Sequence, residues 1–167
     1  MEVTVRPARI GLGLFATTRF LPGERILRIE GRIVDHRVLW RRQGSRFSAN
    51  CFRFGPETYL DPGEGPGCYV NHSCGPNAGI QKSRNQLFLF AAERIVAGSE
   101  ITIDYSTTLG DDDIWTMRCN CGHRRCRRTV RNFGSLPADV RLRYLGRGLV
   151  PGYIIRTLEE RNPREVG

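Results

Sequence analysis

The stretch NHSCGPN, which runs from Asn71 to Asn77, is the main indication of the fold in this 167-residue sequence. It is dense in side chains that form hydrogen bonds, and its Gly75-Pro76 pair demands a fixed turn. A lone histidine in such a loop is more often a structural hydrogen-bonding group than a catalyst. Ser73 beside His72 does not make a hydrolase site, because no GxSxG nucleophile motif is present.

Two further motifs follow, ITIDY over 101–105 and CNCGHRRC over 119–126, and a glycine-rich segment, GLGLFAT over 11–17, precedes them. The spacing Cys119-x-Cys121-x4-Cys126 is typical of a metal site, and structural zinc takes four ligands. The candidates for a fourth ligand are Cys51, Cys68, Cys74 and His123. The alternative is a set of reduced free thiols. A tyrosine that ends a strand, as Tyr105 does, is by itself more often a core residue than a catalytic one.

The composition fits one soluble globular domain, with 40% hydrophobic and 26% charged residues. No apolar run approaches the roughly 20 residues of a membrane helix, and Glu2, Arg6 and Arg9 argue against a signal peptide. We therefore expect no membrane partner and a location in the cytosol, or in a nucleus if the source has one. The net charge of +9 indicates either an acidic partner such as nucleic acid or arginines spread over the surface. Lys82 is the only lysine.

Alternating apolar residues and turn residues predict a mainly β fold of many short strands rather than alternating strands and helices. The candidate strands are Val3–Arg6, Leu12–Ala16, Glu24–Ile29, Phe47–Phe54, Thr58–Leu60, Gln86–Ala92 and Glu100–Asp104. Short helices are expected over Asp35–Gln43, Pro137–Tyr144 and Pro151–Arg161. The last two either pack over the domain or form a loosely docked tail.

Taken in order, the motifs resemble those of SET-domain methyltransferases, through GLGLFATTRFLPGERI, NHSCGPN, GSEITIDY and CNCGHRRCR, over about Val5 to Arg127. The resemblance implies a SET-domain fold of short strands in small sheets. It also implies a pseudoknot, in which the Asn71–Asn77 loop passes under a later segment. The implied parts are a SET domain over 1–117, a post-SET zinc loop over 118–130 and a C-terminal helical extension over 131–167.

The resemblance also implies roles for individual residues. Tyr105 matches the catalytic tyrosine, and Ile29 and Ile103 match positions that line the substrate channel. Contacts to S-adenosylmethionine (SAM) are implied for Ile10, Gly11, Leu12, Gly13, Asn71, His72 and Tyr105. The implied ligands of a structural zinc ion are Cys74, Cys119, Cys121 and Cys126. That leaves His123 as a non-ligand, and Cys51 and Cys68 as small buried residues.

The implied function is SAM-dependent transfer of methyl groups to the ε-amine of a lysine in a basic protein, either histone-like or another. Because Ile103 is apolar where relatives often carry Phe or Tyr, we expect a product beyond monomethyl-lysine. The acidic run Asp111–Asp113 either attracts a basic peptide or caps a short helix over Ile114–Met117. The positive charge could hold DNA that carries the substrate, and the arginine bias favours a bacterial source with a nucleoid-associated substrate.

Two alternatives to the enzyme stay open. One is a catalytically weak, zinc-stabilised SET-like module that binds protein or nucleic acid. The other is a small basic nucleic-acid-binding protein with a zinc knuckle, although the cysteine spacing does not match the common CxxC fingers. SAM binding separates the enzyme from the nucleic-acid-binding protein, and turnover separates the enzyme from the catalytically weak module. The sequence leaves the oligomeric state open.

Overall fold

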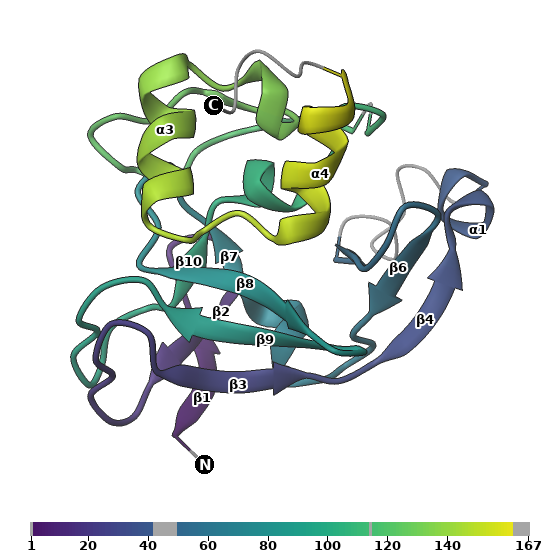
Figure 1. The fold of residues 1–167 in the computed structure, drawn as a ribbon. Helices are drawn as coiled ribbons and strands as arrows, with labels where there is room; N and C mark the ends of the chain where they lie inside the picture. Colours follow the sequence, from purple (N-terminus) through teal and green to yellow (C-terminus); the bar gives the residue numbers. More distant parts are fainter. Residues whose placement is uncertain (1, 42–49, 114, 162–167) are drawn as a thin grey trace.

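The chain is built from small β-sheets and short helices, as the computed structural model shows for residues 2–41, 50–113 and 115–161, the part of the chain that it describes (Figure 1). Two-stranded sheets join β1 (Val3–Pro7) to β2 (Leu12–Ala16), β7 (Asn71–His72) to β10 (Thr102–Ile103), and β11 (Met117–Arg118) to β12 (Thr129–Val130). Three-stranded sheets have the orders β3 (Arg25–Ile29), β9 (Gln86–Ala91), β8 (Ala78–Ser83) and β4 (Arg32–Asp35), β6 (Thr58–Asp61), β5 (Phe52–Arg53). The α-helices are α1 (His36–Trp40), α3 (Ala138–Gly146) and α4 (Gly152–Arg161). The predicted mainly β fold class is confirmed.

The position of β9 in the middle of its sheet explains why its sequence is a continuous apolar run. It pairs with β3 on one side and β8 on the other. Its residues Leu87 and Leu89 point into the main core, whereas Phe90 packs into a second core. A strand that is covered on both faces needs apolar residues at successive positions rather than at alternate ones. β9 therefore joins the two halves of the molecule.

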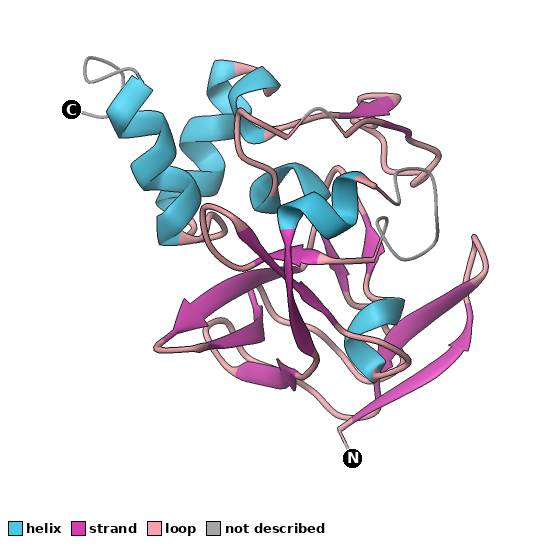
Figure 2. Cartoon of the chain, turned by 90° about the vertical axis from the view of Figure 1, so that its right-hand side faces the viewer, coloured by secondary structure: helices cyan, strands magenta, loops and turns pink. Residues whose placement is uncertain are grey.

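The second core lies between this sheet and the C-terminal helices. Buried Phe133, Tyr144, Leu149 and Ile154 pack there with Phe90. Figure 1 shows α3 and α4 together above β8 and β9, and Figure 2 shows the C-terminal helices again on one side of the strands. The C-terminal helices are therefore a packed cover and not a loosely docked tail.

The NHSCGPN segment is clamped beside the ITIDY segment. β7 and β10 pair in parallel, and the Ser73 N–H donates to the Ile103 carbonyl at 2.9 Å. The Asn77 side chain donates to the Glu100 carbonyl at 2.8 Å and accepts from the Thr102 N–H at 2.9 Å. Both segments of the predicted pseudoknot thus lie side by side, and the threading itself stays a prediction.

Most of the predicted strands are present, and several unpredicted ones join them. The first three predicted strands match β1, β2 and β3 within a residue, and those over 58–60, 86–92 and 100–104 match β6, β9 and β10. α1 ends at Trp40, and residues 42–49, which hold the rest of the predicted helix and the start of the predicted Phe47–Phe54 strand, lie outside the described residues. The strands not predicted are β4, β7, β8, β11 and β12. The helix expected over Ile114–Met117 is wrong, because Met117 begins β11 and pairs with Val130.

None of the helices among the described residues is long and apolar enough to cross a membrane.

Candidate active site

Tyr105 stands at the centre of the candidate site. It begins a 3-10 turn, Tyr105–Thr108, directly after β10, and Asp104 caps this turn by accepting from the Ser106 N–H at 3.1 Å. The Tyr105 hydroxyl donates to the Val70 carbonyl at 2.8 Å. This bond and the turn fix the position of the ring.

The phenol of Tyr105 is a neutral group with an open acceptor. Burial, with a smaller contribution from the Glu100 carboxylate, raises the Tyr105 pKa well above its usual value. The hydroxyl therefore keeps its proton at neutral pH, and that proton is directed at Val70. The lone pairs of the oxygen remain available to accept a weak or ordinary hydrogen bond from a ligand.

Aromatic rings flank Tyr105 on two sides. Its ring centroid lies 5.3 Å from that of His72 and 6.4 Å from that of Trp115. Trp115 is half-buried and was not among the predicted site residues, because no local pattern links it to Tyr105. These rings give the tyrosine an apolar surrounding.

Asn71 ties the glycine-rich segment to this centre. Its side-chain amide donates to the Leu12 carbonyl at 3.0 Å and to Glu100 Oε1 at 2.8 Å. A Cβ atom added to Gly13 would lie 2.5 Å from Glu100 Oε1 and 3.0 Å from Asn71 Nδ2. Only glycine lets the segment approach the Asn71–Glu100 pair this closely.

Two aliphatic side chains next to this contact are open to solvent. Ile10 is 57% exposed and Leu12 is 48% exposed. Between them Gly11 has φ +65°, in the left-handed region that favours glycine, with no atom within 4 Å of an added Cβ. An uncovered apolar pair beside a hydrogen-bonded amide fits a small ligand that has both apolar and polar parts.

His72 links Tyr105 to the cysteine cluster. Its side chain is only 4% exposed, and burial lowers its pKa to about 4. His72 Nδ1 accepts from the Tyr105 N–H at 3.2 Å, which leaves the proton on Nε2. Nε2 lies 3.4 Å from Cys74 Sγ, so the neutral ring donates to the sulfur.

Three of the four predicted zinc ligands, Cys74, Cys119 and Cys121, form one cluster, and Cys126 lies beside Cys119. Cys119 Sγ lies 3.8 Å from Cys74 Sγ and 3.6 Å from Cys126 Sγ, and Cys121 Sγ accepts from the Cys74 N–H at 3.5 Å. A tetrahedron with Zn–S bonds of about 2.3 Å has S–S edges of about 3.8 Å. The two Sγ–Sγ distances from Cys119 therefore match edges of such a tetrahedron.

The His72 ring also lies in this cluster: ligand atoms of His72, Cys74, Cys119 and Cys121 are all within 4.8 Å of one another. The proton on its Nε2 makes this nitrogen a donor to sulfur rather than a metal ligand. Cys126 lies outside that group, but its Sγ is 3.6 Å from Cys119 Sγ, and it stays the predicted fourth ligand.

The thiol acidities also bear on metal binding. Burial raises the pKa of Cys74, and raises that of Cys119 to about 11. For Cys121, burial is outweighed by hydrogen bonds from the backbone N–H groups of Cys74 and His123, and the pKa is lowered to about 7. A bound cation would lower the pKa values of Cys74 and Cys119 and favour the thiolate form that binds metal.

The other candidate ligands lie apart from the cluster. His123 contacts Gly75, and its Nδ1 accepts from the Arg125 N–H at 3.2 Å. Cys51 packs against Val34 and Tyr59, and both Cys51 and Cys68 are half-buried rather than buried as expected.

A buried polar network attaches α3 to the site. The side chain of Asp104 has 0% exposure and lies 2.7 Å from Arg127 Nη2. The Tyr144 hydroxyl donates to Asp104 Oδ2 at 2.9 Å and lies 3.2 Å from the Cys74 carbonyl. The Arg127 N–H donates to Cys74 Sγ at 3.4 Å. The network thus joins the residue before Tyr105, the cysteine cluster and the C-terminal cover.

The acidic run after Tyr105 has a structural role. Arg53, whose side chain is 2% exposed, lies 2.5 Å from Asp112 Oδ1 and 2.7 Å from Asp113 Oδ2. Tyr59 also donates to Asp113. These two carboxylates neutralise a buried guanidinium and do not cap a helix, and attraction of a basic peptide stays a prediction.

The predicted channel residues lie in the main core. Ile29 is 2% exposed and Ile103 has 0% exposure. A Cβ atom added to Gly67 would lie 2.8 Å from Ile29 Cγ2, so the Pro66–Tyr69 turn packs closely on Ile29. Whether either side chain lines a channel stays a prediction.

Comparison with known proteins identifies the family of this chain. Residues 11–106 match the SET domain. This match covers more than half of the chain, so the chain belongs to the SET domain family, as the four motifs predict.

Among its relatives, the human histone-lysine N-methyltransferase 2D is 30% identical over 128 residues, which cover 71% of this chain and 2% of the relative. Human histone-lysine N-methyltransferase 2B is 29% identical over 133 residues, 74% of this chain and 5% of the relative. An H3 lysine-4 specific histone-lysine N-methyltransferase of Mycosarcoma maydis is 30% identical over 128 residues, 70% of this chain and 9% of the relative. The chain thus matches less than a tenth of the length of each of these proteins.

Proposed function

We propose that this SET domain transfers methyl groups from SAM to the ε-amine of a lysine in a basic protein. The observation that carries the proposal is the Tyr105 hydroxyl, whose proton is held by Val70 and whose oxygen is free to accept. The names of the relatives, which are histone-lysine N-methyltransferases, support the reaction class.

The donor site is assigned to the glycine-rich segment and the Asn71 loop. The exposed side chains of Ile10 and Leu12 and the close approach at Gly13 fit a molecule with an aliphatic and a polar part. SAM would supply an electrophilic methyl group on a positively charged sulfur. Asn71 would fix the Leu12 carbonyl as a hydrogen-bond acceptor next to that molecule.

The chain must also provide a neutral amine. A free lysine has a pKa of about 10.4 and is almost fully protonated at neutral pH. Desolvation in a narrow channel beside Tyr105 and Trp115, together with the positive sulfur of SAM, would disfavour the charged ammonium and lower the pKa of a lysine held there. Tyr105 stays protonated at this pH, so no phenolate is available to act as a base. Its oxygen would accept an N–H of the amine and orient the nitrogen lone pair, which is a positioning effect.

Zinc is proposed as a structural ion on Cys74, Cys119, Cys121 and Cys126. It would join the NHSCGPN loop to the post-SET segment and hold His72 and Tyr105 in place through the Nε2–sulfur contact.

The proposed substrate is a basic, DNA-associated protein, histone-like or otherwise, in a nucleus or a bacterial nucleoid. Because Ile103 is apolar, we also propose a product beyond monomethyl-lysine. Mass spectrometry of a well-modified substrate checks this: shifts of two or three methyl groups are expected, and accumulation of monomethyl-lysine alone at long times contradicts it.

The test is incubation of the purified protein with methyl-labelled SAM and a panel of basic proteins. Lys82 is the only lysine of the chain, so Lys82→Arg removes side-chain self-labelling as background. Label on a substrate lysine supports the proposal. If SAM binds in calorimetry but no protein in a broad panel is labelled, the binding-module alternative is favoured, and absence of SAM binding contradicts the proposed donor site.

A further inference from the structure

The positive charge of this chain is concentrated in one segment. Residues 118–147 contain nine arginines and a single acidic residue, Asp139. The rest of the chain has 17 cationic and 16 acidic side chains and is nearly neutral. The net positive charge therefore lies almost entirely in this segment, although arginines also occur throughout the rest of the chain.

This segment forms one side of a concave site. A cavity of about 200 Å³ lies between the Cys74–Pro76 turn, the loop after Cys121 and the last turns of α3. The lining includes His123, Arg124, Arg125, Arg143 and Arg147. None of the residues assigned to SAM lines it.

Little negative charge balances these arginines. Glu93 is the only acidic residue in the cavity lining, and it pairs with Arg147 at 3.0 Å. Within residues 2–41, 50–113 and 115–161, no carboxylate lies within ion-pair distance of Arg124, Arg125 or Arg143. Guanidinium groups gathered around one hollow repel each other, and an anion bound there would relieve the repulsion.

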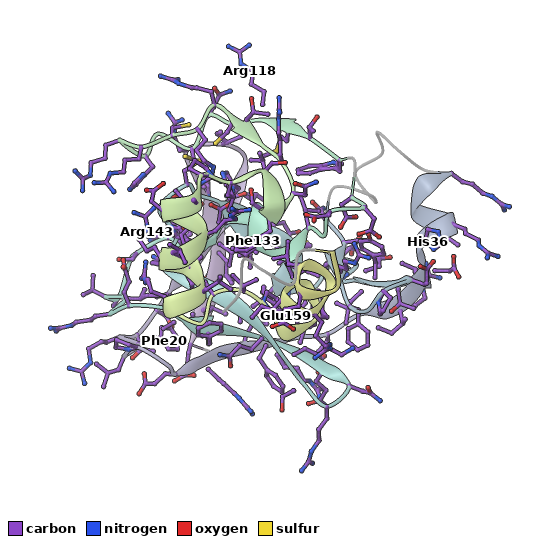
Figure 3. The ribbon with its side chains drawn as sticks, turned by 45° about the horizontal axis from the view of Figure 1, so that its top comes forward. Phe20, His36, Arg118, Phe133, Arg143 and Glu159 are labelled. Carbon is purple, nitrogen blue, oxygen red and sulfur yellow. The ribbon has the colours of Figure 1, made fainter. Side chains whose placement is uncertain are left out.

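The basic surface also extends beyond the cavity. Arg118, Arg128 and Arg131 are exposed on the neighbouring β11–β12 segment. Figure 3 shows Arg118 reaching outward near one border of this face and Arg143 on α3 near the other. A single small anion would occupy the cavity but not the flanking arginines. A polymer with regularly spaced negative charges would contact both.

We propose that this face, defined by Arg118, Arg124, Arg125, Arg128, Arg131, Arg143 and Arg147, binds the phosphodiester backbone of double-stranded DNA. Arginine is suited to this because its planar fork can bind two phosphate oxygens at once. Contacts of this kind position a protein on DNA without reading its sequence. The binding does not require methyl transfer, and it would bring the domain to proteins that are themselves bound to DNA.

The test is fluorescence anisotropy with a labelled 20-base-pair duplex of arbitrary sequence over a series of salt concentrations. The variant is Arg124→Ala/Arg125→Ala/Arg143→Ala. The matched control is Arg19→Ala/Arg37→Ala/Arg84→Ala, which removes three exposed arginines from the turn before β3, from α1 and from the β8–β9 turn. Both triple variants lower the formal net charge equally.

Each lost phosphate contact lowers the slope of log K against log salt by about 0.9. We expect the variant to bind DNA at least about 10-fold more weakly with a slope smaller by about 3, and the control to stay within about twofold. Equal weakening by both triples would overturn the proposal, since bulk charge would then explain the binding. Absence of binding at low salt, or competition by polyglutamate as strong as by unlabelled DNA, would also overturn it.

Melting temperature and zinc content verify that the variants fold. If the triple variant fails to fold, Arg143→Ala alone, which lies outside the cysteine loop, is compared with Arg37→Ala, and a smaller salt slope for Arg143→Ala alone is expected. An unchanged slope would count against the proposal.

Discussion

Tyr144→Phe tests whether the C-terminal cover is joined to the site by the buried network. The substitution removes one hydroxyl and keeps the ring, which is 1% exposed in the second core. The lost hydrogen bond reaches Asp104 Oδ2 at 2.9 Å, on a carboxylate with 0% exposure. Hydrogen bonds to charged groups contribute about 1.5–3 kcal/mol. We therefore expect the free energy of unfolding to fall by about 2 kcal/mol, and the melting temperature by roughly 4–8 °C for a chain of this size.

Tyr153→Phe is the matched control. Tyr153 is also a buried tyrosine on a C-terminal helix, but its hydroxyl donates to the Arg53 backbone carbonyl, a neutral acceptor, at 2.5 Å. Its loss should cost about 1 kcal/mol. Urea unfolding followed by circular dichroism measures both variants. If Tyr144→Phe is no more destabilising than Tyr153→Phe, the assignment of a special role to the Asp104 network is refuted.

The same pair of variants separates positioning from stability. Asp104 caps the turn that carries Tyr105, so Tyr144→Phe should lower kcat at temperatures well below its melting point while leaving the affinity for SAM nearly unchanged. Tyr153→Phe should leave kcat unaffected. Equal kcat values for the two variants would limit Tyr144 to a structural role.

Two further predictions concern the donor site and the cysteine cluster. Gly13→Ala should weaken SAM binding in calorimetry and cost about 1–3 kcal/mol of stability, because the added methyl meets Glu100 Oε1 at 2.5 Å. Gly146→Ala, whose added methyl meets nothing within 4 Å, should neither weaken SAM binding nor lower stability; equal losses in the two variants would contradict the close approach. The purified protein should contain about one zinc ion per chain, and a chelator should lower its melting temperature. Cys126→Ser should abolish tight zinc binding and Cys51→Ser should not, whereas full zinc content in the Cys126 variant would remove this cysteine from the ligand set.

The parts of the fold that the sequence predicts are those encoded by neighbouring residues. Alternating residues predict β1, and a preceding glycine marks the start of β2. The apolar run of β9 predicts a central strand. The turn at Gly75-Pro76 and the closely spaced cysteines are local signals in the same sense. The sequence of β8 does not predict a strand, because Gly79 and the polar residues at its end interrupt the apolar pattern. Its extended structure depends on its pairing with β9.

Contacts between distant segments left no signal in the sequence. Tyr144 meets a carboxylate 40 positions earlier in the chain, and Arg53 meets Asp112 59 positions later. The charge of the acidic run therefore gives no sign of its buried partner. Trp115 approaches Tyr105 only because β11 leads the chain back towards the cysteine cluster.

The most direct test of the central claim is the rate of methyl transfer by the protein and by Tyr105→Phe at saturating SAM, with SAM affinity measured in parallel. The substitution removes the oxygen that would orient the amine and leaves the ring between His72 and Trp115. The account predicts a fall in kcat of about 100-fold or more with SAM affinity nearly unchanged. Equal rates for the two proteins on a substrate lysine would contradict the assignment of Tyr105 as the catalytic centre.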